Sequence, residues 1–556
     1  MWCGKIKEAT KCFTIGLAAG GVALALSFFL RIFAGGLFIP ELAAQTLFSL
    51  TPGAVESQAV EALGSLAKYS AFAGAIAINL FLYGVLGVLL YRTYRKLAQK
   101  GYLFNFLHLV LLSYFILFVL ALILLEVTEV LSQPIPIQLI SLYLIPPHIA
   151  FGFILYEMFQ RHVARPELIQ QKGSPQETSV DIKRRRFLRT AVTVSIASVV
   201  IFYALESLFS KPPEPSYVTT NQTKSLDQGV TEPTIYPSDI AGIFAEPGLA
   251  SFVAAEVTPN DQFYQIDINI VTPKVDANTW KLKVNGLVNN PIELTYEELK
   301  SIPAVEEYAT LECISNKRGG DLISTALWKG VPMKSILEKA DVRSEAIYIV
   351  FRCYDGYDVG IPLEPGLLEG TILAYEMNGV TLSASHGFPL RAVVPGIYGM
   401  MNAKWITEIE LVDKVYEGFW QRRDWSNNAE YQTHSTIVLP GQALTKRFGE
   451  LSSRVVHGGK VQIAGIAFAG VRGISGVEVS TDGGKSWETA RLKDPLSNNT
   501  WVLWAIDWDP LAEGRYEIVV RTTDKTGEVQ TAELRNPFPS GSTGYHRAVV
   551  MVEAPT

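Results

Sequence analysis

Residues 310–321 read TLECISNKRGGD and place Cys313 where a β-rich run gives way to a polar segment. A thiolate at such a strand-to-loop exit would have its pKa lowered by the Lys-Arg pair that follows, and the next two glycines would let a bulky ligand approach the backbone. A lone cysteine on a strand is otherwise a small buried hydrophobic residue, and Cys353 in VFRCYDGYD fits that description better. No nearby His-Asp pair makes either cysteine a hydrolase nucleophile.

The sequence around this motif predicts three soluble segments. Residues 251–432 mix short strands with helices, which indicates an α+β domain. From 433 to 556 the pattern is all β, with strands separated by turns, as in an immunoglobulin-like sandwich. Residues 210–250 are rich in Pro, Thr and Ser without apolar periodicity and are predicted to be a linker.

The front of the chain is predicted to be an α-helical membrane bundle. A hydrocarbon core of about 30 Å takes about 20 helical residues to cross, and five apolar runs are long enough. We place these runs at 12–34, 69–91, 103–125, 135–159 and 187–209. The charges divide accordingly: residues 1–209 carry 17 basic and 11 acidic side chains, whereas the remainder carries 31 and 43.

Positive charge in the connections predicts the orientation, because Lys and Arg resist translocation. Basic residues gather in the N-terminal tail, in the connection at 92–100 and in the connection at 161–189, whereas the alternate connections hold only Lys68. The N-terminus is therefore expected in the cytoplasm. After five crossings of the cytoplasmic membrane, the soluble half is expected on the extracytoplasmic side.

Residues 184–189 read Arg-Arg-Arg-Phe-Leu-Arg and run into the fifth apolar segment. A cluster of positive charge at a membrane boundary is common and needs no further role. The stretch also matches the twin-arginine export pattern Arg-Arg-x-Phe-Leu-Lys/Arg at each position. A twin-arginine signal would export the soluble half already folded, as a protein that loads its cofactor in the cytoplasm requires.

Composition excludes several classes of protein. The soluble part has no strongly basic patch, which argues against nucleic acid as a partner. Four cysteines at positions 3, 12, 313 and 353 exclude a disulfide scaffold and a CxxC metal site, and CxxCH haem attachment is absent. His108 and His148 are the histidines of the apolar segments, and haem b between them stays possible. However, they differ in depth by roughly 10 Å at 1.5 Å per residue, so hydrogen-bonded or headgroup-facing roles are favoured.

Several ordered segments resemble the sulfite oxidase family of molybdopterin enzymes. They are VTPNDQFY (257–264), TLECISNKR (310–318), LAYEMNG (373–379), HGFPLRAVVPGIYGMMNAKWITEIEL (386–411) and GFWQRRDW (418–425). The all-β end, with GVEVSTDGGKSW, is similar to the C-terminal dimerisation domain of that family, which implies a homodimer. The resemblance covers about 251–552 and leaves out the helices in front.

The resemblance implies a role for each of a set of residues. Cys313 matches the cysteine that ligates molybdenum, a soft thiolate beside the two dithiolene sulfurs of one pterin. Arg318 and Arg472 match two arginines near the substrate. The family's substrate-channel tyrosine corresponds to Tyr354 or Tyr357, of which we take Tyr357. The residues implied to contact the pterin cofactor or its phosphate are Asn260, Phe263, Tyr264, Asn316, His386, Arg391 and Lys404.

One departure from the family pattern concerns the substrate. Where sulfite-oxidising members carry Arg-Asn-His after the Thr-Pro-Asn motif and two aromatic residues, the Arg corresponds to Ile266 and the His to Ile268. A charge pair at close range and moderate dielectric is worth on the order of 4 kcal/mol, so the loss of two cations weakens a dianion site. Sulfite is therefore a doubtful substrate.

The expected function is a membrane-anchored molybdenum oxidoreductase that transfers an oxygen atom to or from a small sulfur or nitrogen oxo compound. Its electrons would pass to or from a quinone, a cytochrome or another extracytoplasmic carrier. An S-oxide or N-oxide reductase of the same family is an alternative. A membrane-tethered binding protein that has kept the fold but lost the metal is another, because fold alone does not give function.

Overall fold

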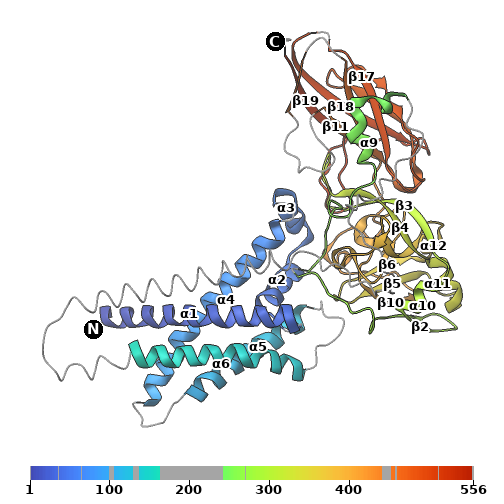
Figure 1. Ribbon diagram of the computed structural model, residues 1–556. Helices are drawn as coiled ribbons and strands as arrows, with labels where there is room; N and C mark the ends of the chain where they lie inside the picture. Colours follow the sequence, from blue (N-terminus) through green and yellow to red (C-terminus); the bar gives the residue numbers. More distant parts are fainter. Residues whose placement is uncertain are drawn as a thin grey trace, which may run out of the picture. The chain divides into compact units, whose positions relative to one another are not determined.

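The computed structural model divides the chain into two compact units, a helical unit and a catalytic unit (Figure 1). The helical unit comprises Met1–Leu50 and Ser65–Glu214, and the catalytic unit comprises Thr51–Gly64 and Pro215–Thr556. The structure describes residues 2–34, 37–63, 66–98, 106–128, 137–162, 242–269, 271–440, 452–456, 460–510 and 512–553. The fifth predicted span at 187–209 and the twin-arginine stretch at 184–189 lie outside these residues.

The helical unit is built from long apolar helices. They are α1 (Trp2–Ala34), α2 (Ile39–Leu50), α4 (Leu66–Ala98), α5 (Phe106–Thr128) and α6 (Ile137–His162). Among the described residues, Glu8–Ile32 and Tyr69–Lys96 are long and apolar enough to cross a membrane, and His108–Leu124 is a shorter apolar helix. These stretches overlap the first three predicted spans, and length and composition alone do not establish that any of them crosses a membrane.

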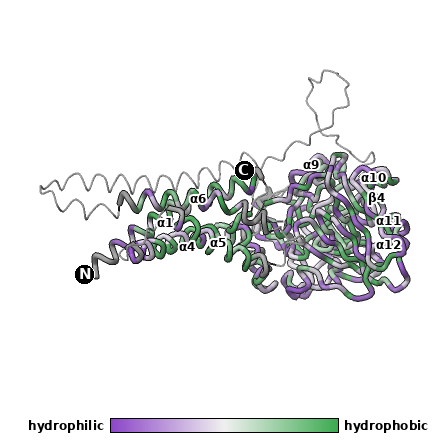
Figure 2. The backbone as a smooth tube through the Cα atoms, turned by 90° about the horizontal axis from the view of Figure 1, so that it is seen from below, coloured by the Kyte–Doolittle hydropathy of each residue, from purple (hydrophilic) through white to green (hydrophobic). Residues whose placement is uncertain are grey.

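Close helix packing in this unit depends on glycine. A Cβ at Gly16 of α1 would lie 2.5 Å from the carbonyl oxygen of Tyr83 in α4, and one at Gly87 would lie 2.8 Å from Gly16 Cα. Small residues at a crossing let two backbones approach, as is usual for membrane helices. The outward faces of α4 and α5 expose large apolar side chains, including Ile78 and Phe115, and in Figure 2 these helices are mostly hydrophobic.

The two histidines of this unit have different surroundings. His148 is buried in α6, where its Nδ1 pairs with the backbone oxygen of Leu144 and its ring lies edge-on to Tyr114. His108 of α5 is exposed. The pairing of His148 agrees with the hydrogen-bonded role expected for it.

From residue 242 onwards, the described part of the catalytic unit begins with three short helical turns: η1 (Gly242–Ala245), η2 (Pro247–Leu249) and α9 (Ala250–Ala254). Ile243, Phe244 and Leu249 are buried in the main hydrophobic core. The prediction that residues 210–250 form a linker is therefore wrong from residue 242 onwards. Composition marked these residues as linker, but three apolar side chains among them supply enough burial to order the segment.

Two sheets form the catalytic domain, the first mixed and the second antiparallel. The first has the order β2–β1–β10–β5–β6, with β1 parallel to β10 and the other pairs antiparallel. Its strands are β1 (Lys281–Gly286), β2 (Ile292–Thr295), β5 (Tyr348–Cys353), β6 (Asp358–Pro362) and β10 (Ile406–Val412). The second has the order β3–β4–β7–β8, with β9 also paired to β7. Its strands are β3 (Val305–Glu312), β4 (Ile323–Pro332), β7 (Ile372–Met377), β8 (Val380–Thr381) and β9 (Arg391–Val393).

The catalytic unit also contains short helices. They are α3 (Gly53–Leu63), α10 (Tyr296–Lys300), α11 (Met333–Ala340), α12 (Leu363–Leu367), η3 (Ala384–His386), η4 (Gly399–Met401) and η5 (Gln421–Arg423). The helix predicted after a threonine cap is confirmed as α10, where Thr295 and Glu298 form a reciprocal capping box. Such a cap satisfies two amide groups that have no partner within the helix.

The C-terminal domain is a two-sheet sandwich, as predicted. One sheet has the order β11–β13–β17–β16 and the other β12–β19–β18–β14–β15. The strands are β11 (His434–Leu439), β12 (Ser452–Val456), β13 (Val461–Phe468), β14 (Ile474–Ser480), β15 (Glu488–Thr489), β16 (Arg491–Leu492), β17 (Val502–Trp508), β18 (Gly514–Asp524) and β19 (His546–Glu553), with η6 (Gly470–Arg472) before β14. Side chains from both sheets, such as Ile463 and Val520, form one core between them.

Candidate active site

A cavity with an empty volume of about 980 Å³, part of it open to solvent, lies in the catalytic unit. Its walls come from four stretches of the catalytic domain, 263–268, 313–315, 355–357 and 386–425, and from α3. The strand ends and loops of both sheets of the catalytic domain therefore meet at one place. Of the predicted site residues, the cavity brings together Phe263, Tyr264, Cys313, Tyr357, His386, Arg391 and Lys404.

Cys313 follows directly after β3, and its thiol faces the cavity. Its backbone amide donates to the carbonyl of Leu322, which fixes the residue, and its Sγ lies 3.0 Å from Ser315 Oγ. The side chain is only 6% exposed, and burial raises the pKa of the thiol despite the Ser315 contacts that lower it. A strongly bound metal ion would overcome this effect, because coordination deprotonates a thiol.

Arg391 and His386 bring a positive charge and a neutral imidazole to the same cavity. Burial lowers the pKa of Arg391 to about 10 and that of His386 to about 4. The Arg391 guanidinium donates from Nη1 to the His386 carbonyl and lies 4.7 Å from the ring centre of Trp328. Its Nε is buried and finds no hydrogen-bond partner among the described residues. A buried donor of this kind is costly unless an anion pairs with it.

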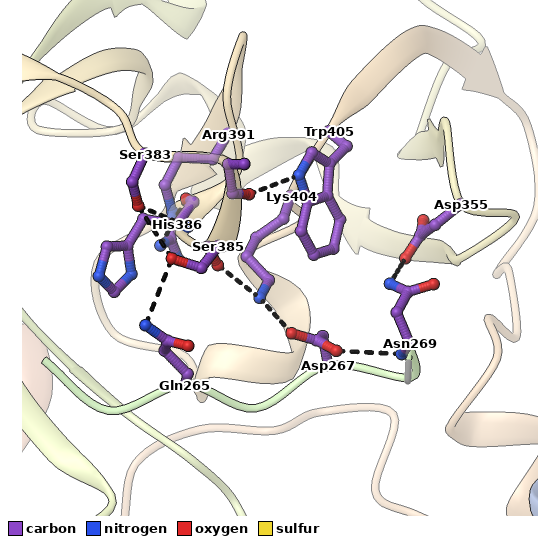
Figure 3. A network of polar contacts seen from close by, with 11 residues as sticks. Gln265, Asp267, Asn269, Asp355, Ser383, Ser385, His386, Arg391, Lys404 and Trp405 are labelled. Carbon is purple, nitrogen blue, oxygen red and sulfur yellow. Dashed lines mark hydrogen bonds and ion pairs between the residues drawn. The ribbon is translucent and has the colours of Figure 1, made fainter. Parts of the chain in front are cut away.

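A polar network extends along the same wall (Figure 3). Lys404 Nζ lies 3.0 Å from Asp267 Oδ2 and donates to the Ser385 carbonyl. Asn269 connects two carboxylates, since its amide N–H donates to Asp267 Oδ1 and its side chain donates to Asp355 Oδ2 at 2.6 Å. Burial raises the pKa of Asp355 to about 6. The network therefore balances the charge of Lys404 and leaves a carboxyl group that titrates near neutral pH.

Two aromatic residues that line the cavity, Trp405 and Tyr357, are fixed by hydrogen bonds to backbone carbonyls. Trp405 has a φ of 54°, which is uncommon for a large side chain, and its indole N–H donates to the Ala384 carbonyl. Such strained backbone tends to occur at functional sites. Tyr357 Oη donates to the Met400 carbonyl at 2.6 Å, whereas Tyr354 is 51% exposed and outside the cavity lining. Of the two tyrosines considered for the substrate channel, the structure brings Tyr357 to the cavity.

Asn260 and Asn316 were predicted to contact the cofactor, but neither lines the cavity. Each instead helps to position another part of the site. The backbone oxygen of Asn260 pairs with His386 Nε2 at 2.8 Å and sets the orientation of that ring. Asn316 donates to Glu312 Oε1 and accepts from the Leu322 amide, which braces the loop after Cys313. Both residues lie close in the sequence to residues that line the cavity. Sequence proximity alone could therefore not tell a residue that lines the cavity from one that supports its neighbours.

The structure does not bring the two predicted substrate arginines to the cavity. Arg318 Nη1 donates to the backbone carbonyls of Arg535 and Thr543. Arg472 pairs with Asp524 at 3.0 Å and also donates to the Tyr431 carbonyl. Backbone oxygens and a carboxylate bind these guanidinium groups, and neither arginine lines this cavity.

Several cavity residues were not predicted as site residues. They are Glu56, Ser57, Ile314, Ser315, Asp355, Gly399, Met400, Asn402, Ala403, Trp405, Trp420 and Trp425, together with the 266–268 stretch. Glu56 and Ser57 come from α3, more than 200 residues before the rest of the site. Trp405 and Trp420 lie within segments of the resemblance, so that signal was available in the sequence, whereas α3 gave none.

Comparison with known proteins identifies the family of this chain. Residues 269–420 match an oxidoreductase molybdopterin binding domain, and residues 427–553 match a Mo-co oxidoreductase dimerisation domain. Mitochondrial sulfite oxidase of Macaca fascicularis is 30% identical over 389 residues, covering 61% of this chain and 70% of that protein. The chain belongs to the sulfite oxidase family of molybdenum-dependent oxidoreductases.

One further relative and one solved structure are similar to this chain. Sulfite oxidase of Arabidopsis thaliana is 29% identical over 362 residues, covering 55% of this chain and 91% of that protein. The crystal structure of the sulfane dehydrogenase SoxCD from Paracoccus pantotrophus matches with a TM-score of 0.44 and 24% identity, covering 53% of this chain and 83% of that chain. The TM-score is too low for this likeness to bear on function.

The residues of the cavity fit the molybdenum cofactor of this family. In the described part of the chain, no group of three or more His, Cys, Asp or Glu side chains is placed to hold a metal ion. Cys313 lines the cavity and offers one soft thiolate ligand to a metal held by a pterin. Arg391, with its unpartnered Nε, offers a buried cation for the negative charge of such a group. The chain is thus an enzyme of the sulfite oxidase type.

Proposed function

We propose that this oxidoreductase transfers an oxygen atom between water and a small, uncharged sulfur or nitrogen compound, with reduction of an S-oxide or N-oxide as the favoured direction. The observation that carries this proposal is the wall at 266–268. Ile266 and Ile268 line the cavity at the positions where the resemblance expects Arg and His in sulfite-oxidising members. Asp267 between them is a carboxylate, so this wall offers a sulfite dianion little stabilisation.

The molybdenum cofactor, when bound, supplies the two-electron chemistry and the exchange of the oxygen atom. Cys313 would hold the metal, and His386, Arg391 and Lys404 would hold the pterin and its phosphate. Reduction of an S-oxide consumes two electrons and two protons and yields a thioether and water. Asp355, whose pKa burial raises to about 6, is able to hold or release a proton at the same wall. Trp405, Trp420 and the two isoleucines would exclude water from the site of a small, uncharged substrate.

A panel of compounds tests the substrate class. With a reduced dye as electron donor, dimethyl sulfoxide, methionine sulfoxide and trimethylamine N-oxide are offered to the purified full-length enzyme, and sulfite is offered with ferricyanide as acceptor. We expect turnover of at least one S-oxide or N-oxide and slow turnover of sulfite. Fast sulfite oxidation without any reduction of the oxides would contradict the proposal.

Restoring a cation to the cavity wall is expected to change the preference. Ile266 is partly exposed, so Ile266→Arg places a guanidinium where the resemblance expects one. A charge pair near a surface is worth up to about 4 kcal/mol, and we expect kcat/KM for sulfite to rise at least about tenfold. Ile266→Met, which adds no charge, is the control and should leave sulfite turnover unchanged. If Ile266→Arg and Ile266→Met changed sulfite turnover equally, charge at this position would not limit the turnover of sulfite.

We extend the proposal to the attachment of the chain to a membrane, its electron partner and its oligomeric state. Exposed apolar side chains on α4 and α5 support an anchor in the cytoplasmic membrane. The basic residues of the N-terminal tail and of the connections at 92–100 and 161–189 support an N-terminus in the cytoplasm and a catalytic unit outside. Electrons would then come from quinone or a cytochrome. The dimerisation-domain match at 427–553 supports a homodimer. A reporter fused after Thr556 should be active only on the extracytoplasmic side, and cytoplasmic activity would refute this topology.

A further inference from the structure

We propose that α3 forms one wall of the catalytic cavity and that its Glu56 hydrogen-bonds the oxo group of the substrate. This inference rests on the proposed reduction of an S-oxide or N-oxide. In the chain, α3 lies between α2 and α4 of the helical unit, yet Thr51–Gly64 belongs to the catalytic unit. A segment that interrupts the apolar helices therefore contributes to the chemistry.

The start of α3 is packed tightly against the loop that ends the molybdopterin-binding domain. A Cβ at Gly53 would lie 2.3 Å from the Arg423 carbonyl oxygen, 2.8 Å from the Phe538 ring and 3.1 Å from Trp425 Nε1. No side chain fits at this contact, so glycine is required there. The amide of Glu56 donates to the Pro52 carbonyl at 3.1 Å, which continues the first turn. Backbone contacts on both sides thus fix the helix start.

From this helix start, Glu56 and Ser57 reach the cavity that Cys313 also lines. Glu56 Oε2 is buried and has no hydrogen-bond partner among the described residues. Burial raises the pKa of the carboxyl to about 8, although the charge of Arg423 acts in the opposite direction. Near neutral pH the group is therefore mostly protonated, with an O–H to donate.

The chemistry of this group suits an uncharged oxo compound. The oxygen of an S-oxide or N-oxide is a strong acceptor and bears no donor of its own. A protonated carboxyl supplies the missing donor in a site that largely excludes water, where an unmade hydrogen bond costs about 1–3 kcal/mol. In its ionised form the same group would repel an anion such as sulfite. Glu56 is thus expected to contribute to binding and to selectivity.

Steady-state kinetics with dimethyl sulfoxide tests the contact. We expect Glu56→Ala to raise KM about tenfold, the equivalent of one hydrogen bond, while Glu56→Gln, which keeps a donor, changes KM less than about threefold. Gln58→Ala, an exposed position on the same helix, is the matched control and should match the parent. Molybdenum content should be the same in all variants. An unchanged KM in Glu56→Ala overturns the contact.

Cysteine labelling tests the position of α3 without relying on turnover. In the full-length holoenzyme, Ser57→Cys and Gln58→Cys are alkylated with iodoacetamide, and each site is followed by peptide mass spectrometry. We expect a saturating concentration of the compound that the parent enzyme turns over to slow alkylation at position 57 and not at position 58. Equal rates with and without that compound at position 57 would overturn the assignment of α3 to the cavity.

The kinetic and the labelling experiments together distinguish a failure of this inference from a failure of the proposed function. If the parent enzyme turns over sulfite and none of the oxides, the proposed function fails and the role of Glu56 as a donor to an oxide fails with it. Protection of position 57 by sulfite would still place α3 at the cavity. If the parent enzyme reduces an oxide and Glu56→Ala behaves like Gln58→Ala, only the role of Glu56 is lost.

Discussion

Cys313→Ser is expected to reduce turnover to less than about one hundredth of the parent rate. Even residues that only support a metal ligand typically cost about 10–100-fold in metal affinity or activity when they are changed, and a direct ligand should cost more. Serine has nearly the same volume, and the backbone hydrogen bond of Cys313 to Leu322 does not involve the side chain. The fold should therefore survive, which circular dichroism and the melting temperature will check.

Cys353→Ala is the matched control for this substitution. Cys353 is a fully buried core residue at the end of β5, and it does not line the cavity. Its replacement should lower the stability by about 1–2 kcal/mol and leave the turnover of correctly folded protein unchanged. If both variants lost activity alike, a general defect in folding would explain the result and Cys313 would have no special role.

Arg391→Met is expected to separate cofactor binding from folding. The guanidinium is buried, and burial lowers its pKa to about 10, so the charge costs stability in the cofactor-free protein. Methionine removes that charge at similar length. We therefore expect the melting temperature of cofactor-free protein to stay level or rise, while the pterin and molybdenum content of purified protein falls more than tenfold.

Arg352→Met is the matched control for Arg391→Met. Arg352 pairs with Glu410 at the surface of the first sheet, away from the cavity, and the pair is worth about 1 kcal/mol or less. This variant should bind the cofactor normally. A large loss of stability in cofactor-free Arg391→Met would mean that Arg391 supports the fold, and normal cofactor content in that variant would contradict its role as the cation for the cofactor.

Local sequence patterns predicted the parts of the site that depend on short segments. Cys313 was expected at a strand end because a β-rich run precedes it, and β3 ends at Glu312. His386, Arg391 and Lys404 lie within 19 residues of one another, so one motif located all three at the cavity. The sandwich was predictable because its strands are regular and separated by turns.

Contacts between distant segments could not be predicted in the same way. Arg318 and Arg472 are cationic and close to predicted site motifs, but Thr543 and Asp524 in the C-terminal domain bind them. Glu56 lies in a stretch between two apolar runs that had no apparent relation to the catalytic domain. Its place at the cavity depends on how Gly53 packs, which is tertiary information.

X-ray absorption at the molybdenum edge tests the central claim most directly, namely that the sulfur of Cys313 binds the metal. The parent enzyme and Cys313→Ser are compared after each has been purified with molybdenum bound, and the number of sulfur neighbours of the metal is determined. The account predicts one sulfur fewer in the variant and no change in Cys353→Ala. The same number of sulfur neighbours in the parent enzyme and in Cys313→Ser would contradict it.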